Sequence, residues 1–335
     1  MRALAGWPIV VLLLGACGSP TSAVAPLAPP RSPTVAVAVD VPPSPSAQPV
    51  SPAASYRSSD CTTVPEVKRV QESASVVRLL RDSAAPPSPS PVSVPTYFAG
   101  PLPANKAEPV RVLLAVHGIG GNGADFAGPL VQFSQANGWL LIAPTFSYRD
   151  YNDALAARAD EPVLLGQIDA LLNDIPRKTG LKIQPKVLAL GFSRGAGTLQ
   201  RFAMVHPDRL AGLAMLSSGG YTLPYPCAQG ERAIQELPFP IGTSGLAQWL
   251  GQPLDAAGFR QVKTWLAVGN DDTEPPTPWD ALLGDNRLQR TSAYANVMRQ
   301  FGVNLQTHVL PNVAHEVTPA ELREAVTFLR DAEKS

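Results

Sequence analysis

The stretch Val187-Leu188-Ala189-Leu190-Gly191-Phe192-Ser193-Arg194-Gly195 decides the fold of this 335-residue chain. An apolar run leads into a Gly-x-Ser-x-Gly pentapeptide, and a helix-like run over residues 196–205 follows it. Glycines two positions to either side of a serine permit a very tight strand-to-helix turn, which would lift the hydroxyl out of the sheet. Because the bare pentapeptide occurs by chance in many proteins, its interpretation depends on the neighbouring sequence.

Three further polar segments follow apolar, strand-like runs. Residues 110–116 lead into His117-Gly118-Ile119-Gly120-Gly121, residues 264–268 into Gly269-Asn270-Asp271-Asp272, and residues 304–310 into Pro311-Asn312-Val313-Ala314-His315. In open parallel sheets, ligands bind at the carboxyl ends of the strands. The chain order of serine, acid and histidine is the one found in hydrolases with this turn. The four segments therefore predict a single site.

On these motifs, the chain resembles the α/β-hydrolase superfamily, and more closely its secreted esterase and polyester-depolymerase-like members. The resemblance covers residues from about Tyr97 to the C-terminus. It implies an α/β fold with a mostly parallel sheet, helices on both faces and a small cap-like insertion. It also implies a serine hydrolase that cleaves small-molecule or polymeric carboxylic esters through an acyl-enzyme intermediate, without a cofactor.

A serine hydroxyl is a weak nucleophile at neutral pH and needs a base to take its proton. The chain has four histidines: His117, His206, His308 and His315. His117 precedes the glycine-rich turn and is expected to shape it, His206 ends a helix-like run, and His308 lies within a strand-like run. His315 falls between the last strand and the last helix, so we expect it to be the base.

The base needs a carboxylate that fixes its tautomer and stabilises its charged form. Related hydrolases commonly carry Gly-x-x-Asp after the corresponding strand, and Gly269 to Asp272 match that spacing. Asp272 is therefore the expected acid, with Asp271 as the alternative. The expected catalytic set is Ser193, Asp272 and His315.

Two backbone N–H groups should form an oxyanion hole. One belongs to Arg194, and the other to the loop after residues 110–116, with Ile119 as the first choice and Gly120 as the second. The Arg194 side chain is expected to pair with a carboxylate. No metal site or phosphate loop is expected, because the chain lacks Cys-x-x-Cys, His-x-x-x-His and Gly-Lys-Ser/Thr after the glycines.

Two other functions share these motifs. A peptidase or amidase would use the same residues, since a fold does not fix the scissile bond. A surface binding protein could use the scaffold without turnover. The chain carries 27 basic and 27 acidic side chains, and this balance argues against a nucleic-acid partner. The sequence indicates no particular protein partner.

The N-terminus is typical of an export signal. Arg2 precedes an apolar run over residues 3–14, which is shorter than the ~20 residues of a membrane-spanning helix. Leu14-Gly15-Ala16-Cys17 resembles the lipobox of bacterial lipoproteins, which implies lipidation of Cys17 and attachment to a membrane of the cell envelope. An ordinary secretory signal is the alternative, and both predict export.

We expect three parts in the chain: a signal segment over residues 1–17, a proline-rich disordered linker over 18–58, and the hydrolase domain over 59–335. The domain core should start near residue 96. Residues 63–81 have helix-like spacing, and residues 97–107 are expected to contain an early edge strand. If Cys17 carries lipid, Cys61 and Cys227 remain for a possible disulfide, and two unpaired cysteines are the alternative.

The remaining elements follow from periodicity and end signals. We expect strands over residues 139–143 and 210–216, a helix starting near Asp160, and a last helix that starts at the capping box Thr318–Glu321 and ends near Arg330. Residues 221–260 are longer than an ordinary connection between a strand and a helix. We expect them to form a partial cap over the site, and a packed crossover is the alternative.

Overall fold

The computed structural model describes residues 74–83, 93–102, 108–229, 234–277 and 281–334. The chain divides into two units, residues 1–54 and 55–335, and all described residues belong to the second. The expected signal segment, linker, Cys17 and Cys61 lie outside the described residues. Among the described residues, no helix combines the length and apolar character needed to cross a bilayer.

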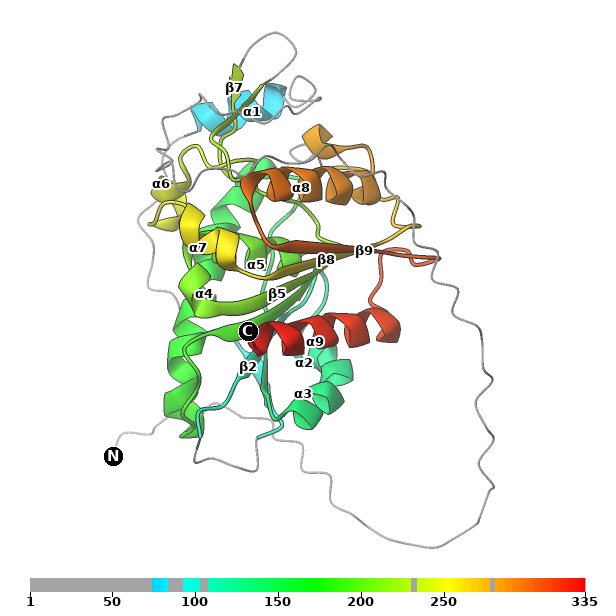
Figure 1. The fold of residues 1–335 in the computed structure, drawn as a ribbon. Coiled ribbons are helices and arrows are strands. Elements are labelled where there is room, and N and C mark those ends of the chain that lie inside the picture. The colour runs from blue at the N-terminus through cyan, green and yellow to red at the C-terminus, as the bar shows by residue number, and fades with distance from the viewer. Residues whose placement is uncertain (1–73, 84–92, 103–107, 230–233, 278–280, 335) are drawn as a thin grey trace, which may run out of the picture. The chain divides into compact units, whose positions relative to one another are not determined.

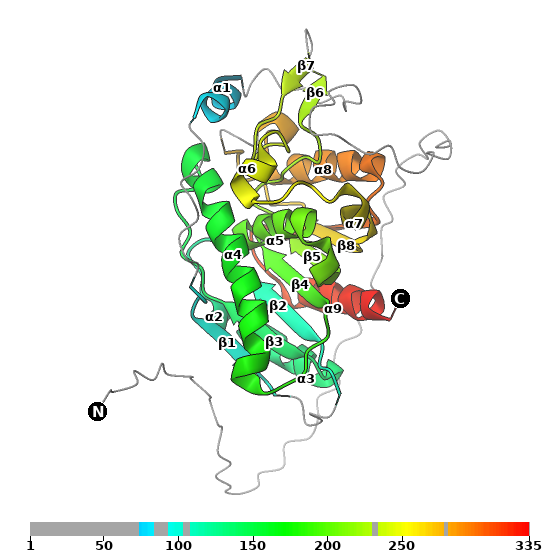
Figure 2. The ribbon, with the colours of Figure 1, turned by 90° about the vertical axis from the view of Figure 1, so that its left-hand side faces the viewer.

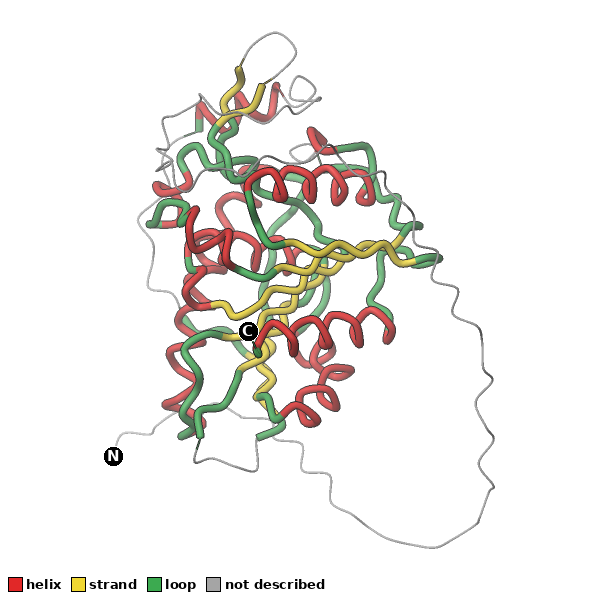
Figure 3. The backbone as a smooth tube through the Cα atoms, in the orientation of Figure 1, coloured by secondary structure: helices red, strands yellow, loops and turns green. Residues whose placement is uncertain are grey.

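A mostly parallel sheet forms the centre of the described part of the chain (Figures 1 and 3). Its seven strands have the order β1-β3-β2-β4-β5-β8-β9, and β1 is the antiparallel one. The strands are β1 (Tyr97–Gly100), β2 (Val112–Val116), β3 (Leu140–Pro144), β4 (Val187–Phe192), β5 (Leu210–Leu216), β8 (Thr264–Gly269) and β9 (Leu305–Leu310). All strands expected from the apolar runs are present, with ends that differ by at most two residues among the parallel strands.

The sheet is covered on both faces because side chains alternate between its two sides. On β2, Val112, Leu114 and Val116 belong to one apolar core, whereas Leu113 and Ala115 belong to another. Helices α2 (Gly123–Ala127), α3 (Val131–Asn137) and α9 (Pro319–Glu333) cover one face, and α4 (Ala154–Thr179), α5 (Arg194–Val205) and α8 (Arg287–Phe301) cover the other (Figures 1 and 2). Short 3₁₀ turns occupy Gly128–Leu130, Pro207–Arg209 and Ala281–Leu283.

Helix α4 begins at Ala154, so the expected start near Asp160 was wrong. Asp153 caps the helix, since its carboxylate accepts hydrogen bonds from the backbone N–H groups of Leu155 and Ala156. Asp160 lies inside α4, and its carboxylate accepts the N–H of Arg149, in the preceding loop, at 2.8 Å. Pro162 therefore lies inside the helix.

The last helix begins as the sequence predicts. The Thr318 hydroxyl accepts the N–H of Glu321, and the Glu321 carboxylate accepts the N–H of Thr318, which completes the capping box. The helix continues to Glu333, beyond the expected end near Arg330. Near the N-terminus, α1 (Ala74–Asp82) buries Val77 and Leu80; the earlier part of the helix expected over residues 63–81 lies outside the described residues.

The segment between β5 and β8 contains a short antiparallel pair, β6 (Cys227–Gln229) with β7 (Ile234–Glu236), followed by α6 (Leu246–Leu250) and α7 (Ala256–Gln261). Its first residues lie beside the expected nucleophile, because the Gly219 N–H donates to the Ser193 carbonyl at 3.0 Å. Its helices pack against α4 and α5. The Asp255 N–H donates to the Met204 carbonyl at the far end of α5.

Cys227 is buried and takes part in a disulfide bond. Its partner lies outside the described residues. Cys61 lies outside them as well, so the expected pairing of Cys227 with Cys61 stays a prediction. The bond would attach the β6–β7 hairpin to an earlier part of the chain.

Candidate active site

The expected nucleophile sits in a backbone conformation that few residues adopt. Ser193 has φ 51° and ψ −120°, between the end of β4 and the first residue of α5. A Cβ on Gly195 would come within 2.4 Å of the Val116 carbonyl oxygen, and one on Gly191 within 2.7 Å of the Ala196 Cα. Both glycines are therefore needed for the close approach of backbone to backbone that forms this turn.

The structure brings Ser193, His315 and Asp272 together in one hydrogen-bonded series. The His315 Nε2 lies 3.0 Å from the Ser193 Oγ, and its Nδ1 lies 2.9 Å from an Asp272 carboxylate oxygen. An ionised carboxylate only accepts hydrogen bonds, so Nδ1 carries the proton and Nε2 is free to accept the serine proton. Phe192 stacks on the His315 ring at a centroid distance of 4.8 Å, which holds the imidazole plane.

The loops that carry the acid and the base are joined by hydrogen bonds. The Asp271 N–H donates to the Val313 carbonyl at 3.0 Å, and the Asn312 N–H donates to the Asn270 side-chain oxygen at 2.7 Å. A Cβ on Gly269 would come within 1.9 Å of the Val313 carbonyl oxygen, so only glycine permits this contact. The Asp272 side chain is buried beside His315, while Asp271 is exposed, which favours Asp272 over its neighbour as the acid.

The other three histidines are differently placed. His117 is 2% exposed, its Nε2 accepts the Phe146 N–H at 3.0 Å, and its Nδ1 donates to the Gly118 carbonyl at 2.6 Å. Burial lowers its pKa, which keeps the ring neutral in this arrangement. His206 packs against Phe202, and His308 pairs with Glu324. His117 thus fixes the glycine-rich loop, in agreement with the sequence interpretation.

That loop lies against the nucleophile. A Cβ on Gly118 would be 3.0 Å from the Ser193 Cβ. Ile119 is 53% exposed, and Gly120 has φ 76°, which turns the loop away from the sheet. On the other side, Arg194 is the first residue of α5, where backbone N–H groups have no partner within the helix. The two expected oxyanion donors, Ile119 and Arg194, therefore lie in segments that flank Ser193.

The comparisons agree with this architecture. A family described as alpha/beta hydrolase fold matches residues 111–267, which include Ser193 but neither Asp272 nor His315. Poly(aspartic acid) hydrolase-1 from Sphingomonas sp. KT-1 superposes with a TM-score of 0.53 at 21% identity, over 70% of this chain and 91% of that one.

The protein has the α/β-hydrolase fold.

Two further solved structures are similar to the chain at lower scores. The Bacillus cereus carboxylesterase has a TM-score of 0.46 at 14% identity and covers 70% of this chain and 93% of its own. A phospholipase/carboxylesterase from Dyadobacter fermentans has a TM-score of 0.46 at 14% identity and covers 72% and 99%. No curated protein sequence matches the chain.

A buried ionic cluster of Arg194, Glu161 and Arg201 lies behind the nucleophile, and the sequence predicted only part of it. The Arg194 guanidinium donates to the Glu161 carboxylate, and Arg201 donates to the same carboxylate at 2.9 Å. All three side chains are at most 1% exposed. The sequence predicted a carboxylate partner for Arg194 but neither Glu161 nor Arg201. Two arginines seven residues apart share one face of a helix, and this spacing is the signal that could have revealed the cluster.

The Asp272 carboxylate has a second partner that sequence reasoning missed. The Arg287 Nε donates to it at 3.1 Å, and the Arg287 side chain is buried. Burial alone would raise the pKa of Asp272, but the hydrogen bond from His315 and the charge of Arg287 hold it below its usual value. Asp272 is therefore ionised at neutral pH.

Asp272, Glu274 and His315 form the one group among the described residues whose potential metal-ligand atoms lie within 4.8 Å of one another. The Arg287 guanidinium contacts both carboxylates of that group. A cation there would face a fixed positive charge, so these residues fit a hydrogen-bonded triad better than a metal centre.

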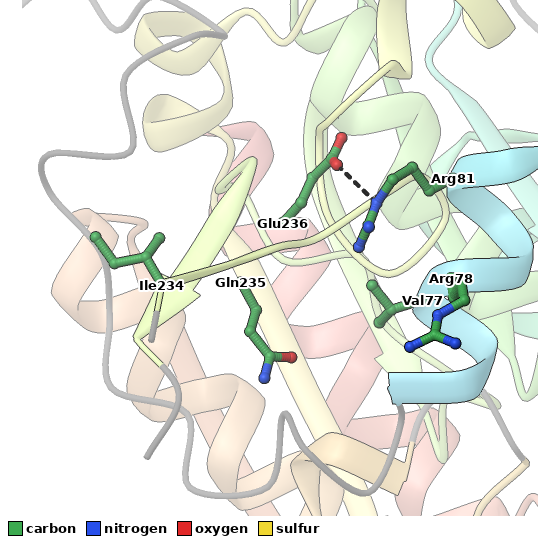
Figure 4. A pocket seen from close by; sticks show the side chains of 6 residues that line it. All are labelled: Val77, Arg78, Arg81, Ile234, Gln235 and Glu236. Atoms are coloured by element: carbon green, nitrogen blue, oxygen red, sulfur yellow. Dashed lines mark ion pairs between the residues drawn. The ribbon is translucent and has the colours of Figure 1, made fainter. Parts of the chain in front are cut away.

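A separate hollow of about 430 Å³ lies between α1 and β7 (Figure 4). Its lining is Val77, Arg78, Arg81, Ile234, Gln235 and Glu236, and an Arg81–Glu236 ion pair of 3.1 Å crosses it. The one carboxylate in this lining, Glu236, is paired with Arg81, and the lining has no serine, cysteine or histidine beside it. The hollow therefore lacks the nucleophile and base pair found around Ser193.

Proposed function

We propose that the protein is a serine hydrolase that cleaves carboxylic esters through an acyl-enzyme intermediate. The observation that carries this proposal is the hydrogen-bonded series from Asp272 through His315 to Ser193. It combines a nucleophile, a base and an orienting acid within hydrogen-bond distance of one another.

The reaction follows from these positions. Ser193 Oγ attacks the ester carbonyl carbon as its proton moves to His315 Nε2, and the N–H groups of Arg194 and Ile119 bind the oxyanion. Collapse of this intermediate breaks the bond to the alcohol oxygen, which takes the proton from His315. A water molecule then attacks the acyl-enzyme with His315 again as base, and releases the acid and the free serine.

A fluorophosphonate probe tests the nucleophile. We expect intact-mass spectrometry to show one adduct on the folded wild type, located to Ser193 by peptide mapping, and no adduct on Ser193→Ala. Labelling of both proteins, or of neither, would show that Ser193 is not an activated nucleophile. A binding function without turnover would be supported if Ser193→Ala retained every measurable activity.

An amidase is the second candidate, because poly(aspartic acid), named for the Sphingomonas structure, is a polymer joined by amide bonds. The site of the present chain is not suited to such a polyanion. Exposed carboxylates lie on the loops that follow the strands, and we call them the acidic rim: Asp150, Asp153, Asp271, Glu274, Asp285 and Glu316. Within the described parts of these loops, Arg149 is the exposed basic residue.

This charge distribution favours neutral or cationic substrates, since like charges repel an anionic chain on approach. We therefore propose a neutral ester as the substrate class. Rates on p-nitrophenyl acyl esters and on matched peptide anilides will separate the two bond types: a higher kcat/KM on the anilides would favour the amidase.

We also propose export and a lipid anchor at Cys17, supported by the apolar run over residues 3–14 and the following Leu14-Gly15-Ala16-Cys17. Incorporation of radiolabelled palmitate into the wild type, but not into Cys17→Ala, tests the anchor. Export of an unlabelled wild type would indicate an ordinary secretory signal.

A further inference from the structure

We propose that Arg287 is a positioning residue that holds the catalytic acid against the loop behind the nucleophile and sets the basicity of His315. The proposal rests on the function proposed above. Arg287 makes no contact with the reacting atoms, and it acts through Asp272.

The first observation is the number of site elements that Arg287 joins. Its Nε donates to Asp272 at 3.1 Å, its Nη1 donates to the Ser218 carbonyl at 2.9 Å, and its Nη2 pairs with Glu274. Asp272 and Glu274 follow β8, whereas Ser218 follows β5. One guanidinium at the first position of α8 therefore connects the loops after two strands.

The second observation is that these contacts close a ring. Gly219, next to Ser218, donates its N–H to the Ser193 carbonyl at 3.0 Å. From Ser193 the ring passes through His315 to Asp272, then through Arg287 to Ser218 and back. Arg287 connects the acid to the loop that follows β5. Without Arg287, the Asp272 side chain would keep its hydrogen bond to His315 but would lose its connection to that loop.

The third observation concerns charge. Arg287 is buried, so its attraction for Asp272 is screened little by solvent. A positive charge next to Asp272 reduces the stabilisation that the carboxylate gives to a protonated His315. Glu274 opposes this effect from the other side of the guanidinium, although its side chain is 54% exposed and more strongly screened.

Other charged or titratable groups also face this part of the site. They include Glu316 in the His315 loop, Asp271 beside the acid, Tyr221 after β5, and Glu321 and Glu324 on α9. Arg290, one turn along α8 from Arg287, donates to the Glu274 carbonyl at 3.4 Å. None of these groups is changed in the variants below. Their effect on the His315 titration and on the pH profile of kcat/KM is therefore the same in every protein compared.

The experiment compares the wild type with Arg287→Gln, Arg287→Lys, Glu274→Gln and Arg299→Gln. The His315 ring is titrated by NMR, and kcat/KM for p-nitrophenyl acetate is measured against pH. Arg299 lies twelve residues further along α8, about 18 Å away, so its variant makes the same change in net charge far from the acid.

In Arg287→Gln we expect the pKa of His315, and with it the acid limb of kcat/KM, to rise by on the order of one pH unit. In Glu274→Gln we expect both to fall by roughly a few tenths of a unit, because that side chain is exposed. Arg287→Lys should keep the acid limb near its wild-type position, because lysine retains the positive charge. It should lower kcat, because an ammonium group lacks the planar guanidinium that donates to Asp272, Ser218 and Glu274 at the same time. Arg299→Gln should match the wild type.

A folded Arg287→Gln with an unchanged His315 titration would overturn the proposal, and so would a Glu274→Gln shift in the same direction as that of Arg287→Gln. If Arg287→Gln does not fold, Arg287→Lys and Glu274→Gln decide the question. The NMR titration needs no turnover, so it tests the role of Arg287 even if the protein proves not to hydrolyse esters; fluorophosphonate labelling tests that separately.

Discussion

The His315 Nδ1 lies 2.9 Å from the carboxylate of Asp272, whereas the side chain of the preceding residue, Asp271, is exposed to solvent. Asp272→Asn would remove the acceptor that fixes the imidazole tautomer. We expect kcat to fall by about 10⁴, as for the corresponding change in a serine protease. The matched Asp271→Asn should stay within about threefold of the wild type on a neutral ester, because the exposed Asp271 carboxylate is screened by solvent and salt. Steady-state kinetics on one ester will check both, and the reverse ranking would make Asp271 the acid.

Glu161 lies between two buried arginines, Arg194 and Arg201. Glu161→Gln would remove the carboxylate that both guanidinium groups share, and Arg194 would keep only the longer contact of 4.0 Å with Asp160 among its ion pairs with described residues. We expect the free energy of unfolding to fall by about 3–5 kcal/mol, which chemical denaturation under non-reducing conditions will measure. Lys334→Gln, at an ion pair exposed on both sides, should change it by less than about 1 kcal/mol. Equal effects of the two changes would contradict the assigned role of the buried cluster.

Glu321 makes stability depend on pH in a defined direction. Burial raises its pKa from 4.5 to about 7, and its Oε1 has no hydrogen-bond partner. Below pH 4.5 the carboxyl is protonated in both the folded and the unfolded state, so its full contribution to stability is present there. As pH rises from about 4.5 to about 7, the unfolded state ionises first and stability is lost.

Glu321→Gln should remove this dependence while keeping the capping box, which also accepts glutamine. We expect the variant to be more stable than the wild type by about 2–3 kcal/mol at pH 8 and nearly equal to it at pH 4.5. Denaturation curves at the two pH values will measure the difference. If the difference in the free energy of unfolding between the two proteins is the same at both pH values, Glu321 does not titrate in this range.

The acidic rim should discriminate between substrates by charge. We expect kcat/KM for p-nitrophenyl hemisuccinate to be roughly three- to tenfold below that for p-nitrophenyl butyrate, because the rim repels the free carboxylate. The ratio should approach one as NaCl rises to about 0.5 M, where screening is strong. The double variant Asp271→Asn/Glu316→Gln should reduce the discrimination at low salt. A ratio that does not respond to salt would mean that pocket shape, rather than charge, sets the preference.

The strands that precede the site residues could be predicted from the sequence, but the side chains that support the site could not. Ser193 and Asp272 follow β4 and β8, whose residues are buried almost throughout, whereas His315 follows the edge strand β9, whose residues are mostly exposed or half-buried. In all three cases a strand-like run precedes a polar segment, so the strand ends could be predicted from local patterns. The start of α4 was not predicted correctly, because Asp160 followed by Pro162 has the pattern of a helix start, whereas the residue that caps the helix is Asp153.

The charged supports depend on contacts between distant residues. Arg287 meets the Ser218 carbonyl 69 positions away, and Arg201 meets Glu161 40 positions away. In the sequence, Glu161, Arg201 and Arg287 are charged residues of the kind usually found on exposed helix surfaces. The spacing of Arg194 and Arg201 places them on one face of a helix, but it does not identify Glu161 as their partner. Their roles become visible only once the fold brings the helices together.

The hydrogen bonds between residues 269–272 and 310–315 have a practical consequence for protein engineering. The two loops share backbone contacts that leave no room for a side chain at Gly269. Acid and base therefore form one transplantable module, and a graft that moves either loop alone would separate Asp272 from His315. The turn that carries the nucleophile is a separate module, because its backbone contacts depend on Gly191 and Gly195. To reshape the site, a designer can therefore change the residues between the two modules and keep each module unchanged.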